Sequence, residues 1–214
     1  ASYIGASSVS SVAYLSQINL MLSALGGGLA VGASIKVSEA YGAGDFKLVK
    51  RRVSTLFALC GILGGGLLLI LIPFAPQFLR FAKTPEEFIA EGTTYFILDL
   101  IGTVLNFFNS VYIAIERARG NSRRILHLNM GVILVKLSLT ALFVYGFHSG
   151  INMIAAATII SQCLMFAAAI YHLSQKGNAF SFAVRSISLK RRVVRPMILL
   201  SVPVIIEIGR ASCR

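Results

Sequence analysis

Long apolar segments separated by short polar ones run through the whole chain. Five apolar runs are complete and a sixth starts near Pro196; the complete ones cover residues 14–37, 53–74, 92–115, 125–145 and 151–173. A helix that crosses the roughly 30 Å hydrocarbon core of a bilayer needs about 20 residues at about 1.5 Å each. We therefore predict an all-α fold: a polytopic transmembrane bundle of five complete helices plus the start of a further one.

Composition supports a membrane protein and excludes other classes. Of the 214 residues, 56% are hydrophobic and 13% are charged, which is too little polar surface for a water-soluble domain. The formal net charge of +12 invites a nucleic-acid partner, but the cations fall in short clusters between apolar runs, without a recognisable binding signature. Motifs such as G-x-S-x-G or H-E-x-x-H do not occur. We expect membrane lipids as surroundings, no nucleic acid, no catalytic residues and no metal ligands.

Lysine and arginine mark one side of the predicted bundle. If successive loops alternate between sides, one side receives only Arg80 and Lys83. Basic residues near helix ends resist translocation, so the richer side is predicted to be cytoplasmic in a multi-pass plasma (inner) membrane protein. Its loops are 42–45, 117–124 and 176–195. The cations in these loops or at the adjoining helix end are Lys47, Lys50, Arg51, Arg52, Arg117, Arg119, Arg123, Arg124, Lys176, Arg185, Lys190, Arg191, Arg192 and Arg195.

The last of these loops divides the chain. Phe180, Phe182, Val184 and Ile187 alternate with cations there, which suits either an amphipathic helix in the membrane interface or a solvated linker. We predict a first transmembrane bundle over 1–178, a basic amphipathic cytoplasmic linker over 179–195 and the start of a second bundle over 196–206. Residues 207–214, "EIGRASCR", resemble a translated sequencing adapter and are expected to be a non-native tail.

Three loop motifs resemble those of one transporter family. They are "GGGLAVGASIKVSEAYGAGDFKLVKRRV" at 26–53, "RARGNSRR" at 117–124 and "INMIAAATIISQ" at 151–162, where Ile154 replaces a usual glycine. In order and spacing they resemble the multidrug and toxic compound extrusion (MATE) family of efflux transporters.

The resemblance implies an antiporter of twelve helices in two six-helix bundles. Such a protein exports cationic or amphipathic drugs in exchange for protons or sodium and needs no cofactor besides the coupling ion. This chain would supply helices two to six, the linker and the beginning of helix seven, so it would be the N-terminal half fragment. Its expected partners are a small organic substrate and the missing second bundle of the same polypeptide.

Two alternatives lead to different functions. A lipid-linked oligosaccharide flippase shares the superfamily architecture, and such proteins often use cavity cations to hold a pyrophosphate, which Lys136 would suit. A structural membrane scaffold is disfavoured because it gains nothing from the intramembrane charges of Lys136 and Asp99, which are costly in a bilayer.

Lys136 lies near the middle of the run over 125–145. We expect it to face the bundle cavity, although a snorkelling or structural lysine is the plainer interpretation. Many members of the family carry N-x-x-x-D on this helix, and the matching positions hold Lys136 and Thr140. Lysine cannot ligate sodium, so the acidic version of the site is absent here; Lys136 would instead pair with an acidic residue on the missing first helix.

Asp99 is the second candidate, as a proton-carrying carboxylate, a partner of Lys136 or a structural hydrogen-bonding group. Asn106 and Asn109 follow it at near-whole helical turns, so all three can share one face. Thr158 matches a threonine that lines the cavity in the family; helix packing explains it equally well. Gln17 and Asn19 are further cavity candidates or interhelical hydrogen-bonding groups.

Two polar features of the loops have structural explanations. Lys36 and Glu39 are spaced for a local ion pair. Asp45, at the end of "GAGD", is expected to cap the helix that follows it.

Overall fold

The computed structural model describes the backbone at 6–81, 86–143, 151–175 and 180–212. Within these ranges it describes the side chains from Asn19 onward, except those at 78, 81, 86–88, 90–91, 151, 184 and 208–212. Within those ranges there are six α-helices and one 3₁₀ turn: α1 (Ala6–Gly42), α2 (Phe46–Phe81), α3 (Glu86–Ala118), α4 (Ser122–Ala141), α5 (Ile151–Leu173), η2 (Val184–Ser186) and α6 (Arg191–Ser212). Five of them are long and apolar enough to cross a membrane. The predicted all-α bundle with five complete spans is confirmed.

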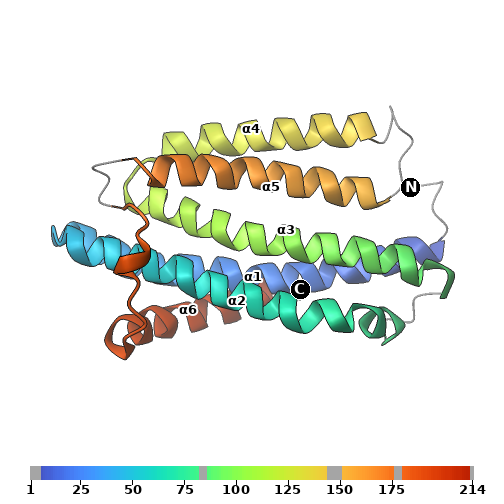
Figure 1. Ribbon diagram of the computed structural model, residues 1–214, viewed down its shortest axis with the longest axis horizontal. Helices are drawn as coiled ribbons and strands as arrows, with labels where there is room; N and C mark the ends of the chain where they lie inside the picture. The colour runs from blue at the N-terminus through green and yellow to red at the C-terminus, as the bar shows by residue number, and fades with distance from the viewer. Residues whose placement is uncertain (1–5, 82–85, 144–150, 176–179, 213–214) are drawn as a thin grey trace.

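The helices lie roughly parallel in a stack with α3 at its centre (Figure 1). α3 packs against α1, α2 and α5, whereas α4 contacts α5 and, to a lesser degree, α3. On the other side α6 packs along α1. The buried core therefore gathers around α1, α2 and α3, where Val37, Val53 and Phe107 are all fully buried.

Helix ends differ from the apolar runs because capping, not hydropathy, sets where a helix begins. α2 starts at Phe46, since the Asp45 carboxylate accepts a hydrogen bond from the Leu48 N–H at 3.0 Å, as predicted for a cap. Gly44 and Gly120 carry the positive φ angles, 72° and 76°, of the two tight turns before α2 and α4. α6 likewise begins at Arg191, five residues before the apolar run starts near Pro196.

Glycines let α1 approach its neighbours closely. A Cβ on Gly26 would lie 2.0 Å from Cδ1 of Phe107 on α3, and one on Gly32 would lie 2.4 Å from the Cα of Ser201 on α6. Gly28 meets Ile205 of α6 in the same way, at 2.5 Å from its Cγ1. Gly28 and Gly32 thus form a G-x-x-x-G contact of the kind that lets membrane helices pack backbone to backbone.

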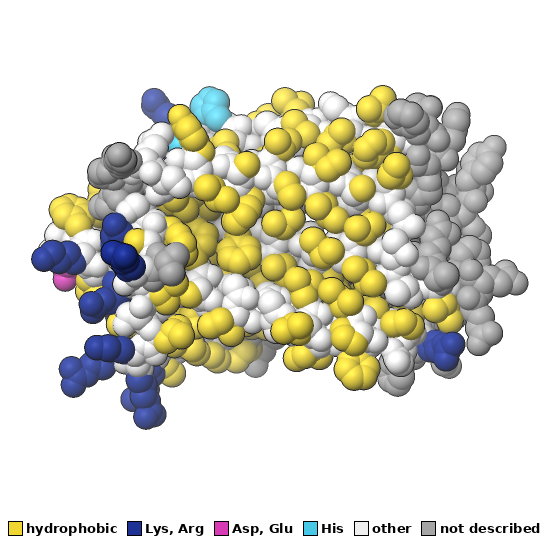
Figure 2. Space-filling view, viewed as in Figure 1, with side chains coloured by type: hydrophobic (Ala, Val, Ile, Leu, Met, Phe, Trp, Pro, Cys, Tyr) yellow, Lys and Arg dark blue, Asp and Glu magenta, His cyan; other side chains and the backbone are white. Residues whose placement is uncertain are grey.

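Basic side chains gather at one end of the bundle, as the positive-inside count predicts (Figure 2). At that end Glu116 is fully buried and joined to Arg119 at 3.0 Å, Arg124 at 3.6 Å and the Asn121 amide at 3.1 Å. The arginines of "RARGNSRR" thus satisfy a buried carboxylate and tie the end of α3 to the start of α4. Lys36 and Glu39 form the predicted local ion pair at 2.7 Å.

The structure of residues 180–190 distinguishes between the two structures considered for the linker from its sequence. Residues 180–190 contain one 3₁₀ turn and no α-helix, so an interfacial helix is wrong for this stretch. Its backbone is bonded to α2: Ala183 N–H donates to Ser54 Oγ and Ser188 N–H donates to Thr55 Oγ1, both at 3.1 Å. Phe180 is buried beside Tyr41 and beneath the Arg119 guanidinium. We call residues 180–190 the strap.

Candidate ion-binding pocket

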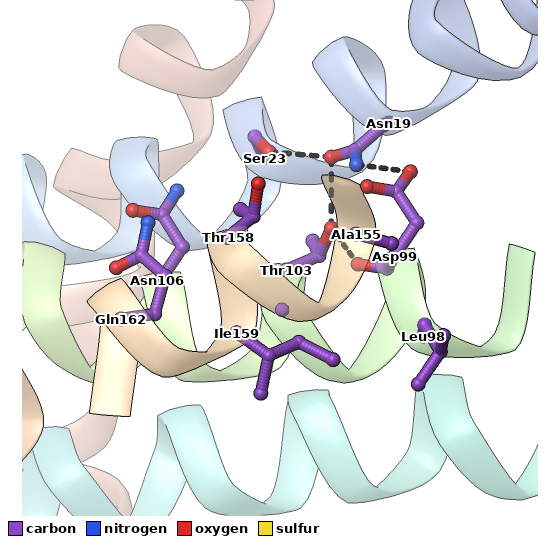
Figure 3. A pocket seen from close by; sticks show the side chains of 11 residues that line it. Asn19, Ser23, Leu98, Asp99, Thr103, Asn106, Ala155, Thr158, Ile159 and Gln162 are labelled. Atoms are coloured by element: carbon purple, nitrogen blue, oxygen red, sulfur yellow. Dashed lines mark hydrogen bonds between the residues drawn. The ribbon is translucent and has the colours of Figure 1, made fainter. Parts of the chain in front are cut away.

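A small polar pocket lies between α1, α3 and α5 (Figure 3). Each helix supplies two polar residues four positions apart, which places both on the same face of that helix. The pairs are Asn19 and Ser23 on α1, Asp99 and Thr103 on α3, and Thr158 and Gln162 on α5; Asn106 joins them from the next turn of α3. Three helices thus bring seven polar side chains together within an apolar bundle.

Asn19 is the centre of the hydrogen-bond network. Its amide nitrogen donates to Oδ2 of Asp99, and its Oδ1 accepts from Thr103 Oγ1 at 2.8 Å and from Ser23 Oγ at 3.1 Å. This arrangement satisfies one carboxylate oxygen of Asp99 and leaves Oδ1 with no hydrogen bond from any described residue. The free oxygen can accept a proton or ligate a cation.

The cavity volume of about 90 Å³ limits what can bind here. Since a water molecule occupies about 30 Å³ in the liquid, the pocket has room for a few waters or for one ion with part of its hydration shell. Sites for drug-sized molecules usually measure about 300 Å³ or more. The pocket within this bundle is therefore of ion size.

Asn109 forms a second polar layer next to the pocket. It is only 2% exposed, and its amide nitrogen donates to the side-chain oxygen of Gln162 and to the Gln162 carbonyl. The predicted shared face of Asp99, Asn106 and Asn109 is found, with Asp99 and Asn106 in the pocket wall and Asn109 behind it. Its contact fixes Gln162 on α5 against α3.

Lys136 and Thr140 lie away from the pocket on α4. The Lys136 side chain is exposed, and among the described residues no ion pair within 4.0 Å connects it to Asp99. Thr140 is half-buried outside the pocket lining. The structure thus brings Asn19, Asp99, Asn106 and Thr158 together and leaves these two apart, while the side chain of Gln17 lies outside the described residues.

Ser23, Thr103 and Gln162 also line the pocket and were not predicted from the sequence. A signal for them exists, because each follows a predicted residue by four positions on the same helix: Asn19, Asp99 and Thr158. All three would have been found by looking for a polar side chain four residues after each intramembrane polar candidate.

Comparison with known proteins agrees with the fold. The MatE family model matches residues 1–142 of the chain. The chain belongs to the MATE family. A curated relative, the probable multidrug resistance protein YoeA of Bacillus subtilis (strain 168), is 24% identical over 184 residues, which is 84% of this MATE chain and 40% of the relative.

Solved structures show the same arrangement of helices. A multidrug resistance MATE family transporter of the MOP superfamily, in its inward-facing conformation, superposes with a TM-score of 0.87 at 21% identity, covering 97% of this chain and 47% of that one. A MOP superfamily transporter from Pyrococcus furiosus Vc1 (DSM3638), described as having a binding pocket of reversed polarity that suggests a different function, gives a TM-score of 0.86 at 22% identity and covers 97% and 46%. The chain spans about half the length of these transporters or less.

Proposed function

We propose that this chain forms the first lobe of a secondary antiporter that exports cationic or amphipathic organic compounds in exchange for protons or sodium ions. The observation that carries the proposal is Asp99: an intramembrane carboxylate with one oxygen held by Asn19 and the other open to a pocket of ion size. Ionisable groups at such depth are expensive and mark ion or proton pathways.

The pocket offers mostly oxygen ligands, which suits a hard cation or a proton. Besides the Asp99 carboxylate, hydroxyls of Ser23, Thr103 and Thr158 line it. Protonation of Asp99 would neutralise the charge and keep the hydrogen bond from Asn19, whereas sodium would draw the surrounding oxygens inward. Either event changes the charge balance among α1, α3 and α5, which is how a coupling ion can bias the packing of a bundle.

The organic substrate needs more room than this pocket provides. We place its site in a larger cavity between this lobe and a second bundle of the same polypeptide, so that the two lobes rock around it. The name of the Bacillus subtilis relative, a probable multidrug resistance protein, supports a drug-like substrate. The basic end of the bundle would face the cytoplasm, by the positive-inside rule, in the plasma membrane.

The test is substrate-driven ion release in proteoliposomes containing the full-length protein. With proton coupling, adding a cationic dye should release protons; with sodium coupling, transport of the dye should require sodium. Asp99→Asn should abolish the coupling of dye to ion while dye binding persists. Glu39→Gln is the matched control, because it removes a carboxylate on an exposed helix end, outside the pocket. Coupling that survives Asp99→Asn at full strength contradicts the proposed role of Asp99.

The competing function is a flippase for lipid-linked oligosaccharides. It is favoured by the exposed Lys136 on α4, a cation where an acidic site would be expected, and by the reversed pocket polarity described for the Pyrococcus furiosus relative. A flippase should bind a lipid pyrophosphate and lose this binding in Lys136→Gln, with no response to cationic dyes. An antiporter should give the opposite pair of results.

A further inference from the structure

A second cavity lies where the strap passes into α6, far from the ion-binding pocket. It is a shallow groove of about 400 Å³ lined by four apolar residues and two arginines: Leu189, Val194, Ile198, Leu199, Arg191 and Arg195. Leu189 and Leu199 are 58% and 60% exposed. Nothing in the proposed antiport cycle uses this groove.

The groove is amphipathic along its length. Arg191 and Arg195 are one turn apart on the same side of α6, in its first two turns. Leu199 follows Arg191 by eight residues, which places it about 12 Å further along the helix axis at about 1.5 Å per residue. The charged part therefore sits where headgroups would lie, and the apolar part extends toward the hydrocarbon core.

The two guanidinium groups have no acidic partner in the described part of the chain. Its ion pairs within 4.0 Å all involve Glu39 or Glu116, and these bind other cations. Two uncompensated arginines above an apolar surface complement a ligand that is anionic at one end and hydrocarbon at the other.

The segment that lines the groove is held at both of its ends. Ser188, next to Leu189, is fixed by Thr55, whose Oγ1 accepts from the Ser188 N–H at 3.1 Å. Further along α6, Ser201 Oγ lies 3.2 Å from the Leu29 carbonyl of α1, across the G-x-x-x-G contact. A preformed groove binds without the cost of ordering its own walls.

We propose that this groove binds an anionic phospholipid of the surrounding leaflet. The phosphate lies between Arg191 and Arg195, and one acyl chain follows Val194, Ile198 and Leu199. A zwitterionic lipid fits less well because its own cation compensates the phosphate and repels the arginines. The site concerns anchoring of the strap to the membrane and does not depend on which substrate or coupling ion the transporter uses.

The experiment measures lipid binding to the full-length protein in detergent micelles. Dioleoyl-phosphatidylglycerol, dioleoyl-phosphatidylcholine and inorganic phosphate are titrated separately while the melting temperature of the protein is followed. We expect the double variant Arg191→Gln/Arg195→Gln to bind phosphatidylglycerol about 30-fold more weakly, since each cation near an anionic lipid contributes roughly one factor of five. Its melting temperature without lipid should equal that of the wild type, because both arginines are exposed.

A matched control separates a built site from diffuse attraction. Lys190→Gln/Arg192→Gln removes the same charge from neighbouring exposed positions that do not line the groove, and it should keep most of the affinity. Equal loss in both double variants would mean unspecific attraction.

Equal stabilisation by phosphatidylcholine would mean that the headgroup charge is irrelevant, and the absence of any lipid effect would mean that the second bundle or another copy covers the groove. Equal stabilisation by inorganic phosphate would mean a free-anion site; each of these results overturns the proposal.

Discussion

α3 and α4 each carry one charged residue in the middle of an apolar run, and the sequence alone treats the two alike. Asp99 on α3 is hydrogen-bonded to α1 and faces a pocket shared with α5. Lys136 on α4 is exposed, and 6% of the membrane-spanning window of α4 is buried against 44% for α3. A charged residue is thus part of a hydrogen-bond network on α3, whereas on α4 it has no ion-pair partner among the described residues.

The difference shows that helix position in the bundle decides what a charge can do. α3 has neighbours on three sides, so polar groups on its buried faces depend on partners within the protein, as the Asn109 amide nitrogen does on Gln162. α4 has one main neighbour, and its free face carries Leu126, Ile133, Leu134 and Leu137. Substitutions on the two helices should therefore have very different consequences.

The largest effect is expected where α3 and α4 are joined. Glu116→Ala removes a fully buried carboxylate and leaves Arg119 and Arg124 without their shared partner, so the protein should lose about 3 kcal/mol of stability. A thiol-reactive dye can follow unfolding through the buried Cys60 once the exposed Cys163 and the terminal Cys213 are replaced. Glu39→Ala, the exposed counterpart, should unfold like the wild type; equal losses in both variants would show that the Glu116 cluster adds nothing.

A pair of glycine substitutions tests the packing difference directly. Gly26→Ala forces a methyl group to within 2.0 Å of the Phe107 ring on α3, and such overpacking should cost about 2 kcal/mol. Gly131→Ala on α4 meets nothing within 4 Å and should raise stability by about 0.5 to 1 kcal/mol through helix propensity. The same dye assay measures both, and a stabilising Gly26→Ala would contradict the close contact of α1 with α3.

Removing the carboxylate from the pocket should cost somewhat less. Asp99→Leu leaves the half-buried Asn19 amide nitrogen without its acceptor, which we expect to lower stability by roughly 1.5 kcal/mol. The double variant Asn19→Leu/Asp99→Leu removes both partners and should recover part of the loss. Purely additive single effects in this cycle would show that the two residues do not interact.

The smallest effect is expected at the exposed charge on α4. Lys136→Leu should leave the melting temperature unchanged or raise it slightly, because the side chain has no partner at contact distance in the described bundle. A clear fall in melting temperature in the full-length protein would instead reveal an acidic partner on a helix that covers this face. That result would favour the hypothesis that Lys136 substitutes for a bound cation.

Much of the fold follows from hydropathy, because an apolar run of sufficient length has few alternatives to a spanning helix. The cap at Asp45 and the ion pair of Lys36 with Glu39 were also predictable, since both are local. The strap was not, because its structure depends on Ser54 and Thr55, more than a hundred residues away. Its alternating pattern alone suits a helix equally well.

Part of the pocket was predictable, because the polarity of single residues within an apolar run is a local feature of the sequence. Polarity within apolar runs selects Asn19, Asp99, Asn106 and Thr158, and all four line the pocket. Which faces of α1, α3 and α5 meet is set by close contacts such as Gly26 against Phe107, and these do not appear in any local pattern. Lys136 passed the same polarity test and yet lies outside the pocket, because α4 is not part of the three-helix junction.

The strap does not act as a flexible linker, because its backbone is bonded to α2. Ser54 and Thr55 hold the strap against α2, and the glycine contacts at Gly28 and Gly32 hold α6 against α1. The chain is therefore fixed to the bundle both before and after residue 190. In the two-lobe antiporter proposed above, a second lobe could therefore not pivot about a flexible linker at this point. Its motion would have to bend α6 further along or break the contact of α6 with α1, so the hinge would lie beyond the boundary predicted from composition.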